Sequence, residues 1–143
     1  MAVSPIPAGY HTVTPYIMTD SVRDLLAFTQ NGLGAEILEK MEMPDGAVMH
    51  AEIRIGDSII MMGQAREDAP SMPTMLYLYV EDCDAAYQKA IDAGAISERE
   101  PEDQFYGDRS GGVKDPLGNQ WWFGTRIEEV SMEEAMKRMM SNG

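Results

Sequence analysis

Hydrophobic and polar residues alternate strictly over residues 47–55 of this chain. Alanine, methionine and isoleucine occupy one side of that stretch, and Val48, His50, Glu52 and Arg54 occupy the other. Alternation with a period of two is typical of a β-strand with one buried face. Similar patterns, rich in β-branched and aromatic residues and bounded by Gly, Pro and Asp, predict further strands over 12–18, 35–43, 58–62, 74–80, 95–100, 104–114 and 119–125.

Three other segments have apolar residues at helical spacing. The first follows Asp20 or Ser21, either of which can cap a helix, and it should end near Gly32 or Gly34. The second runs from a capping Asp82 to about residue 93. The third covers residues 131–142 and carries a stripe of methionines, for which a packing face is the plain interpretation.

The order of these elements occurs twice, as β-α-β-β-β, with an offset near sixty residues. The sequence therefore predicts an α+β protein with two similar modules in one domain. We expect an N-terminal arm over 1–10, a first module over 11–63, a polar linker over 64–73, a second module over 74–126 and a C-terminal helical segment over 127–143.

Composition narrows the possible partners. The net charge of -13 argues against nucleic acid and anionic membranes as partners, because binding phosphate groups requires clustered Lys and Arg. It permits a cationic ligand. The chain has no apolar run near the ~20 residues that a membrane span requires, and its single Cys83 cannot form an intramolecular disulfide. These features predict a soluble protein of the reducing cytoplasm.

The doubled module and the last-strand motif DPLGNQWWFGT resemble the vicinal oxygen chelate superfamily, which includes glyoxalases, bleomycin-resistance proteins and extradiol dioxygenases. TPYI, MHAEIRIGDSIIMM, LYLYVEDCDAA and YGDRSGGVKDPLGNQWW look more closely like the branch often labelled glyoxalase-like or demethylubiquinone methyltransferase-like. The resemblance implies two modules that form a curved mixed sheet around a cavity. It also implies a homodimer, with or without exchange of modules between its chains.

Metal enzymes of that superfamily take one ligand from each of four strands. The corresponding positions here hold Thr14, Ile60 or Met61, Met75 and Trp122. A divalent ion prefers imidazole nitrogen and carboxylate oxygen, which none of these side chains supplies. We therefore expect no metal and no other cofactor, unless a divalent ion is recruited by a different set of residues.

If those four positions still face a cavity, its lining is aromatic and rich in thioethers, which suits a planar or cationic ligand. The alternative is that the same side chains fill a small core or a dimer interface. The resemblance also places Asp108 and Arg109 at the cavity mouth, where Arg109 could clamp a carboxylate or orient Asp108, or the pair could lock the Gly-Gly bend that follows. The predicted ligand-binding residues are Tyr16, Met61, Met75, Tyr77, Tyr79, Asp108, Arg109 and Trp122.

His50 and Glu52 form the best candidate for acid-base chemistry, because residues two apart on a strand point the same way. The simpler interpretation is an exposed strand face on which Arg54 completes a ladder of ion pairs.

The sequence and the resemblance are consistent with two alternative functions. The first is a glyoxalase or bleomycin-resistance-like protein that binds a small aromatic or cationic molecule in a metal-free cavity. The second is an enzyme of lyase, isomerase or dioxygenase type. That enzyme would use His50 and Glu52 either with a recruited metal and a residue of the partner chain, or for proton transfer with His50 as base. A third possibility is a module that serves only dimerisation or regulation.

Overall fold

The computed structural model describes residues 2–142 and contains the two predicted β-α-β-β-β repeats. The first repeat consists of β1 (Tyr16–Thr19), α1 (Val22–Leu33), β2 (Glu36–Glu42), β3 (Val48–Ile55) and β4 (Ser58–Gln64). The second consists of β5 (Met75–Tyr79), α2 (Cys83–Asp92), β6 (Ile96–Asp103), β7 (Asp108–Lys114) and β8 (Gln120–Arg126), and α3 (Met132–Asn142) follows it. The predicted α+β class is confirmed, and its sheet consists of two separate four-stranded parts.

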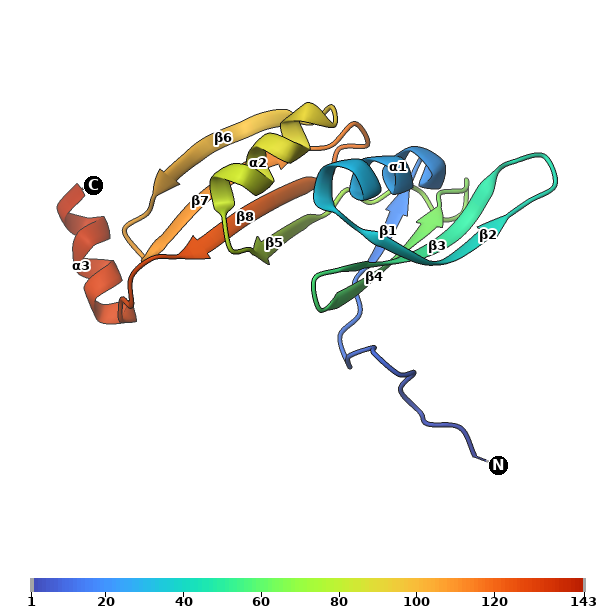
Figure 1. The fold of residues 1–143 in the computed structure, drawn as a ribbon, viewed down its shortest axis with the longest axis horizontal. Coiled ribbons are helices and arrows are strands. Elements are labelled where there is room, and N and C mark those ends of the chain that lie inside the picture. The colour runs from blue at the N-terminus through green and yellow to red at the C-terminus, as the bar shows by residue number, and fades with distance from the viewer. Residues whose placement is uncertain (1, 143) are drawn as a thin grey trace.

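Each repeat forms one mixed sheet, in the order β1-β4-β3-β2 or β5-β8-β7-β6. The first strand of each repeat runs parallel to the fourth, and the other neighbours are antiparallel. The two sheets lie side by side, and α1 and α2 pack against each other over the same face of both (Figure 1). We call the opposite face of each sheet, turned away from these helices, the underside.

The core lies between the sheets and the helices. Its largest fully buried side chains include Leu25 of α1, Ile53 and Met62 of the first sheet, and Trp121 and Phe123 of β8. Both helices begin as the sequence predicts. The hydroxyl of Ser21 accepts the backbone N–H of Asp24 at 3.1 Å, and the carboxylate of Asp82 accepts that of Ala85 at 3.1 Å.

A buried carboxylate fixes the turn between β7 and β8. Asp115, which is 3% exposed, accepts hydrogen bonds from the backbone N–H groups of Leu117 (2.8 Å) and Asn119 (3.0 Å) and from the indole of Trp121 (2.8 Å). The side chain of Asn119 in turn accepts the backbone N–H of Thr74 at 3.0 Å, just ahead of β5. The motif DPLGNQWW therefore has a structural role, because it joins the two central strands of the second sheet.

The hairpin between β6 and β7 turns later in the chain than the sequence predicted. We expected a break at 101–103, but β6 continues through Pro101 to Asp103 and the chain turns at Gln104–Gly107, where Gly107 has φ +100°. A proline inside a strand usually argues against that strand. Pro101 is tolerated because β6 is the edge strand, and the pairing with β7 is irregular between Arg99 and Glu102.

Two smaller predictions were also imprecise. The first strand is shorter than predicted, since β1 begins only at Tyr16. Val48 was expected beside His50, but an irregularity opposite Met41 and Glu42 interrupts the alternation and Val48 is buried. Within residues 2–142, no helix is long and apolar enough to cross a bilayer.

Candidate functional site

Two tyrosines on the underside of the second sheet converge on one carboxylate. Tyr77 and Tyr79 both belong to β5, and their hydroxyl groups donate to the same oxygen of Asp108 on β7, at 2.8 Å and 3.0 Å. Their rings meet edge to face with centroids 5.2 Å apart. Asp108 is only 4% exposed, whereas Tyr79 is 70% exposed. The arrangement places a buried negative charge behind two accessible aromatic rings.

A glycine makes this convergence possible. Strand β8 lies between β5 and β7, and the ring of Tyr77 passes over Gly124 of β8, where any Cβ atom would clash with the phenol. The first sheet repeats the crossing, because the ring of Tyr16 on β1 passes over Gly63 of β4. Both undersides therefore have a tyrosine that reaches from the first strand of the repeat to the third.

The environment keeps both phenols of the second sheet protonated. Partial burial raises the pKa of Tyr77 well above its ordinary value, and the hydrogen bond to Asp108 raises it further. The pKa of Tyr79 is raised mainly by its own hydrogen bond to Asp108, because ionisation would place two negative charges together. Both hydroxyl groups thus remain hydrogen-bond donors at neutral pH.

Trp122 lies on the same underside, with its ring directly over Gly112 of the neighbouring strand β7. The guanidinium carbon of Arg99, from β6, is 4.9 Å from the centroid of that ring. The same guanidinium donates to the backbone oxygen of Ser110 at 3.3 Å and to its hydroxyl. Arg99 was absent from our sequence-based set, because its strand has no clear alternation.

The underside of the first sheet has a line of polar side chains. The hydroxyl of Tyr16 lies 3.2 Å from Nδ1 of His50, and Nε2 of His50 lies 2.8 Å from a carboxylate oxygen of Glu52. The other oxygen of Glu52 accepts a hydrogen bond from the hydroxyl of Tyr10, in the N-terminal arm. The structure thus brings His50 and Glu52 together as expected. Arg54 is not part of this line, and its nearest acidic partner is Glu36 at 3.9 Å.

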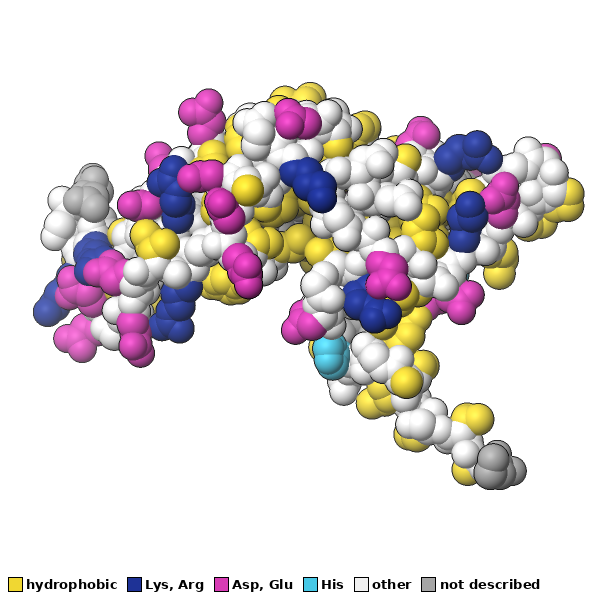
Figure 2. Space-filling view, in the orientation of Figure 1, with side chains coloured by type: hydrophobic (Ala, Val, Ile, Leu, Met, Phe, Trp, Pro, Cys, Tyr) yellow, Lys and Arg dark blue, Asp and Glu magenta, His cyan; other side chains and the backbone are white. Residues whose placement is uncertain are grey.

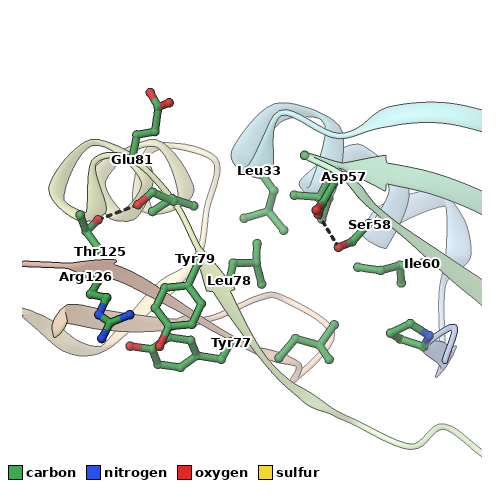
Figure 3. Close-up of a pocket in the computed structure, with 15 residues that line it drawn as sticks. Leu33, Asp57, Ser58, Ile60, Tyr77, Leu78, Tyr79, Glu81, Thr125 and Arg126 are labelled. Atoms are coloured by element: carbon green, nitrogen blue, oxygen red, sulfur yellow. Dashed lines mark hydrogen bonds between the residues drawn. The ribbon is translucent and has the colours of Figure 1, made fainter. Parts of the chain in front are cut away.

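Between the two modules lies a groove of about 1000 Å³ (Figure 3). Tyr77 and Tyr79 line it, and the aliphatic side chains of Leu33, Ile60 and Leu78 face the same space from both modules. The lining also includes three charged residues, namely Asp57, Glu81 and Arg126. Five other predicted ligand-binding residues lie on the undersides but outside the lining of this groove, namely Tyr16, Met61, Met75, Asp108 and Trp122.

Arg109 points away from this region. It follows Asp108 on β7, so its side chain emerges on the helix-covered face of the sheet, where its guanidinium pairs with Asp84 of α2 at 3.1 Å and Asp103 of β6 at 3.0 Å. A role in orienting Asp108 has no support in this geometry. Through these two ion pairs, Arg109 connects α2 to the hairpin of β6 and β7.

The family model of the Glyoxalase/Bleomycin resistance protein/Dioxygenase superfamily matches residues 10–123. The chain belongs to this superfamily. A relative from Mycobacterium bovis, an uncharacterized protein, is 32% identical over 157 aligned residues that span all of this chain and 99% of the relative. A Mycobacterium tuberculosis protein of the same description is also 32% identical and is covered to 88%.

Solved structures of the superfamily share the fold at low identity. TioX from Micromonospora sp. ML1 has a TM-score of 0.71 at 18% identity, covering 82% of this chain and 99% of TioX. TnmS3 from Streptomyces sp. CB03234, described as an antibiotic binding protein, has a TM-score of 0.65 at 18% identity over 88% of this chain and 98% of TnmS3. A glyoxalase-related enzyme from Fulvimarina pelagi has a TM-score of 0.65 at 14% identity, and the match covers 81% of this chain and 88% of that enzyme. Binding proteins and enzymes thus both occur among these superfamily neighbours.

The residues of this superfamily member do not fit a complete catalytic metal site. Over residues 2–142, no three His, Cys, Asp or Glu side chains gather closely enough to hold an ion. His50 and Glu52 supply two donors, but their neighbours on the underside are the phenols of Tyr16 and Tyr10. Catalytic sites for zinc usually have three protein ligands. The pair of His50 and Glu52 is therefore one protein ligand short of such a site.

Proposed function

We propose that this superfamily member binds a small aromatic or cationic molecule in the groove between its modules, without a metal ion. The observation that carries the proposal is the shared hydrogen bonding of Tyr77 and Tyr79 to the buried Asp108 at the edge of the groove. The two rings are held in place with their faces accessible, so a planar ligand can stack on them without ordering them first. The aliphatic walls add apolar contact area.

The charges around the groove favour a cation. Among its lining residues, Asp57 and Glu81 are acidic and Arg126 is basic, and Asp108 lies behind the tyrosines. Acidic side chains are also spread over both modules on the face shown in Figure 2, in keeping with the net charge of -13. Aromatic faces attract cations through their quadrupole, and a nearby carboxylate strengthens that attraction. That TnmS3 is described as an antibiotic binding protein is consistent with this proposal.

Calorimetric titration tests the proposal with two planar probes of the same three-ring size, the cation proflavine and the anion anthracene-9-carboxylate. We expect proflavine to bind more tightly. Tyr79→Phe keeps the ring and should retain most of the affinity, whereas Tyr79→Ala should lose about 1 kcal/mol of binding free energy, the usual contribution of a stacked aromatic contact. Met139→Ala, on the exposed face of α3, is the control. Equal binding of proflavine by the wild type and by a Tyr77→Ala, Tyr79→Ala double variant would contradict the proposal.

We further propose that the protein functions as a cytoplasmic homodimer, with or without exchange of modules. Met75 of β5 and the α3 residues Met132, Met136 and Met140 leave apolar surface exposed outside the groove, and a second copy could cover it. Sedimentation equilibrium at several concentrations tests the assembly. A single monomeric species throughout would contradict it.

A second candidate function is favoured by the contact between His50 and Glu52. A carboxylate 2.8 Å from an imidazole nitrogen fixes the ring and supports an acid-base role. In that case the protein is an enzyme that moves a proton on its ligand. Loss of turnover in a folded His50→Ala variant would support the enzyme.

A further inference from the structure

The line of polar residues under the first sheet has a chemistry different from that under the second. It runs from Tyr16 through His50 and Glu52 to Tyr10, with 3.2 Å between the first two and 2.8 Å between the next two. In the second sheet, the corresponding tyrosine ends on the carboxylate of Asp108, where the chain of contacts stops. Only in the first sheet is the tyrosine followed by an imidazole, the side chain whose charge most readily changes near neutral pH.

The donors and acceptors along this line follow from the carboxylate. Glu52 can only accept hydrogen bonds when ionised, so Nε2 of His50 carries the hydrogen that lies between them. Nδ1 then presents its lone pair, and the hydroxyl of Tyr16 donates to it. The Tyr16 oxygen keeps its own lone pairs for a ligand.

Access to the line is restricted to one end. Both nitrogens of His50 are occupied by neighbours, and the side chains of His50 and Glu52 are only 26% and 16% exposed. Tyr16 is 51% exposed. Pro15, next to it in the chain, lines the groove between the modules. Of the residues in this line, Tyr16 is therefore the most open to a ligand that extends from the groove along the underside.

We propose that the Tyr16 hydroxyl, and not His50, is the group that accepts a proton from the ligand, and that the ligand is an aromatic molecule with an acidic hydroxyl group. The ligand's O–H bond breaks and its proton passes to the Tyr16 oxygen. The Tyr16 proton passes at the same time to Nδ1 of His50. The ligand becomes an oxyanion that accepts a hydrogen bond from Tyr16, and the new imidazolium is stabilised by Glu52. Charge is conserved, and no further reactant is needed.

Tyr10 is a positioning residue in this proposal. Its hydroxyl occupies the Glu52 oxygen that does not face His50, and so fixes the orientation of the carboxylate. The arm that carries Tyr10 also lies against the sheet, since Gly9 is close enough to Ile59 for an added Cβ to touch it at 3.7 Å, and Ile59 is only 7% exposed. The N-terminal arm thereby contributes a residue to the site.

The inference rests on the proposed function only in taking the ligand to be a small aromatic molecule. Two matched probes test it, 4-nitrophenol and 4-nitroanisole, which differ in the acidic hydrogen. Absorbance reports whether bound 4-nitrophenol is ionised, and ¹⁵N NMR of the imidazole reports the protonation of His50. We expect 4-nitrophenol to bind about tenfold more tightly, the effect of one charge-assisted hydrogen bond. We also expect it to bind as the phenolate and to convert His50 from the Nε2–H form to imidazolium.

Variants assign the roles. Tyr16→Phe keeps the ring over Gly63 and should abolish the preference for 4-nitrophenol together with the change at His50. Tyr10→Phe should reduce both, with a mixture of tautomers at His50 in the free protein. Tyr77→Ala removes a ring that lines the groove and should weaken both probes alike, while it leaves their ratio unchanged because Tyr77 belongs to the second sheet.

Three results would overturn the inference. They are equal binding of the two probes with no change at His50, a preference that survives Tyr16→Phe, and no binding of 4-nitrophenol at all. The proflavine titration is independent of all three, so it shows whether the proposed function fails as well.

Discussion

The hydroxyl group of Tyr77 lies 2.8 Å from a carboxylate oxygen of Asp108, and the ring of Tyr77 reaches it by passing over Gly124. The contact therefore depends on a position with no side chain. Gly124→Ala should push the phenol off the carboxylate, while Tyr77, which is partly exposed, has space to move. We expect a loss of proflavine affinity of about tenfold with a cost to folding of about 1 kcal/mol. Calorimetry and urea unfolding measure the two effects, and Met139→Ala, on the exposed face of α3, is the control.

The raised pKa of Tyr77 predicts how stability changes at high pH. Above pH about 10, tyrosines of the unfolded chain lose their protons while Tyr77 in the folded protein keeps its own. The unfolded state then binds fewer protons, so the free energy of unfolding falls as pH rises. Urea unfolding between pH 8 and about 11 should show a steeper fall for the wild type than for Tyr77→Phe. Parallel curves would contradict the assigned pKa shift.

Replacement of Asp115 should destabilise the fold without any direct effect on a ligand. Asp115→Ala leaves two backbone N–H groups and the buried indole of Trp121 without an acceptor. We expect a loss of about 3 kcal/mol in the free energy of unfolding. Asp68→Ala, in the exposed linker, should change it by less than about 0.5 kcal/mol. A similar small change at both positions would show that the turn is not held by this carboxylate.

Cys83 should react slowly with thiol reagents. It is 2% exposed, its thiol donates to the backbone oxygen of Phe123 at 3.4 Å, and burial raises its pKa. Labelling with iodoacetamide at pH 8 should be about a thousandfold slower than labelling of glutathione, since it requires local opening. Urea at the unfolding midpoint should restore the rate. Rapid labelling of the folded protein would show that the thiol is accessible.

Metal content tests the metal-free part of the proposed function. Protein purified without chelator or affinity tag should contain far less than one divalent ion per chain by elemental analysis. Titration with zinc, nickel and manganese should leave proflavine binding unchanged. Stoichiometric metal that disappears in His50→Ala would instead indicate a site on the pair of His50 and Glu52, and it would favour the enzyme.

The sequence predicted the order of the elements and the faces of the strands better than it predicted the contacts. The family resemblance, together with period-two alternation in β1 and β5, grouped Tyr16, Met61, Tyr77 and Trp122 on one side, and all four lie on the undersides. Alternation along a strand also places the side chains of Asp108 and Arg109 on opposite faces of the sheet. The prediction that treated these two residues as one motif overlooked this. The predicted break at 101–103 was wrong because a proline fits within an edge strand, and the edge position of β6 is a property of the whole sheet.

The two residues that the sequence did not identify share a physical cause. Tyr10 lies in an arm without periodicity, and Arg99 lies on an irregular edge strand. Neither segment has a local pattern that indicates where its side chains point. Both residues reach the undersides through contacts with strands far away in the sequence, and such contacts cannot be deduced from local spacing.

The tyrosine-over-glycine crossing also bears on how proteins of this architecture diverge. Both modules keep the crossing tyrosine and its glycine, while the residue that receives the hydroxyl differs, His50 in one and Asp108 in the other. The residue of the third strand that contacts the tyrosine hydroxyl thus sets the chemistry of each underside. The rest of the sheet accommodates an imidazole in one module and a carboxylate in the other. The two recipients stand at different register positions, because His50 lies opposite Gly63 whereas Ser110, and not Asp108, lies opposite Gly124. The same crossing therefore serves recipients at two different points along the third strand, without any change in the sheet.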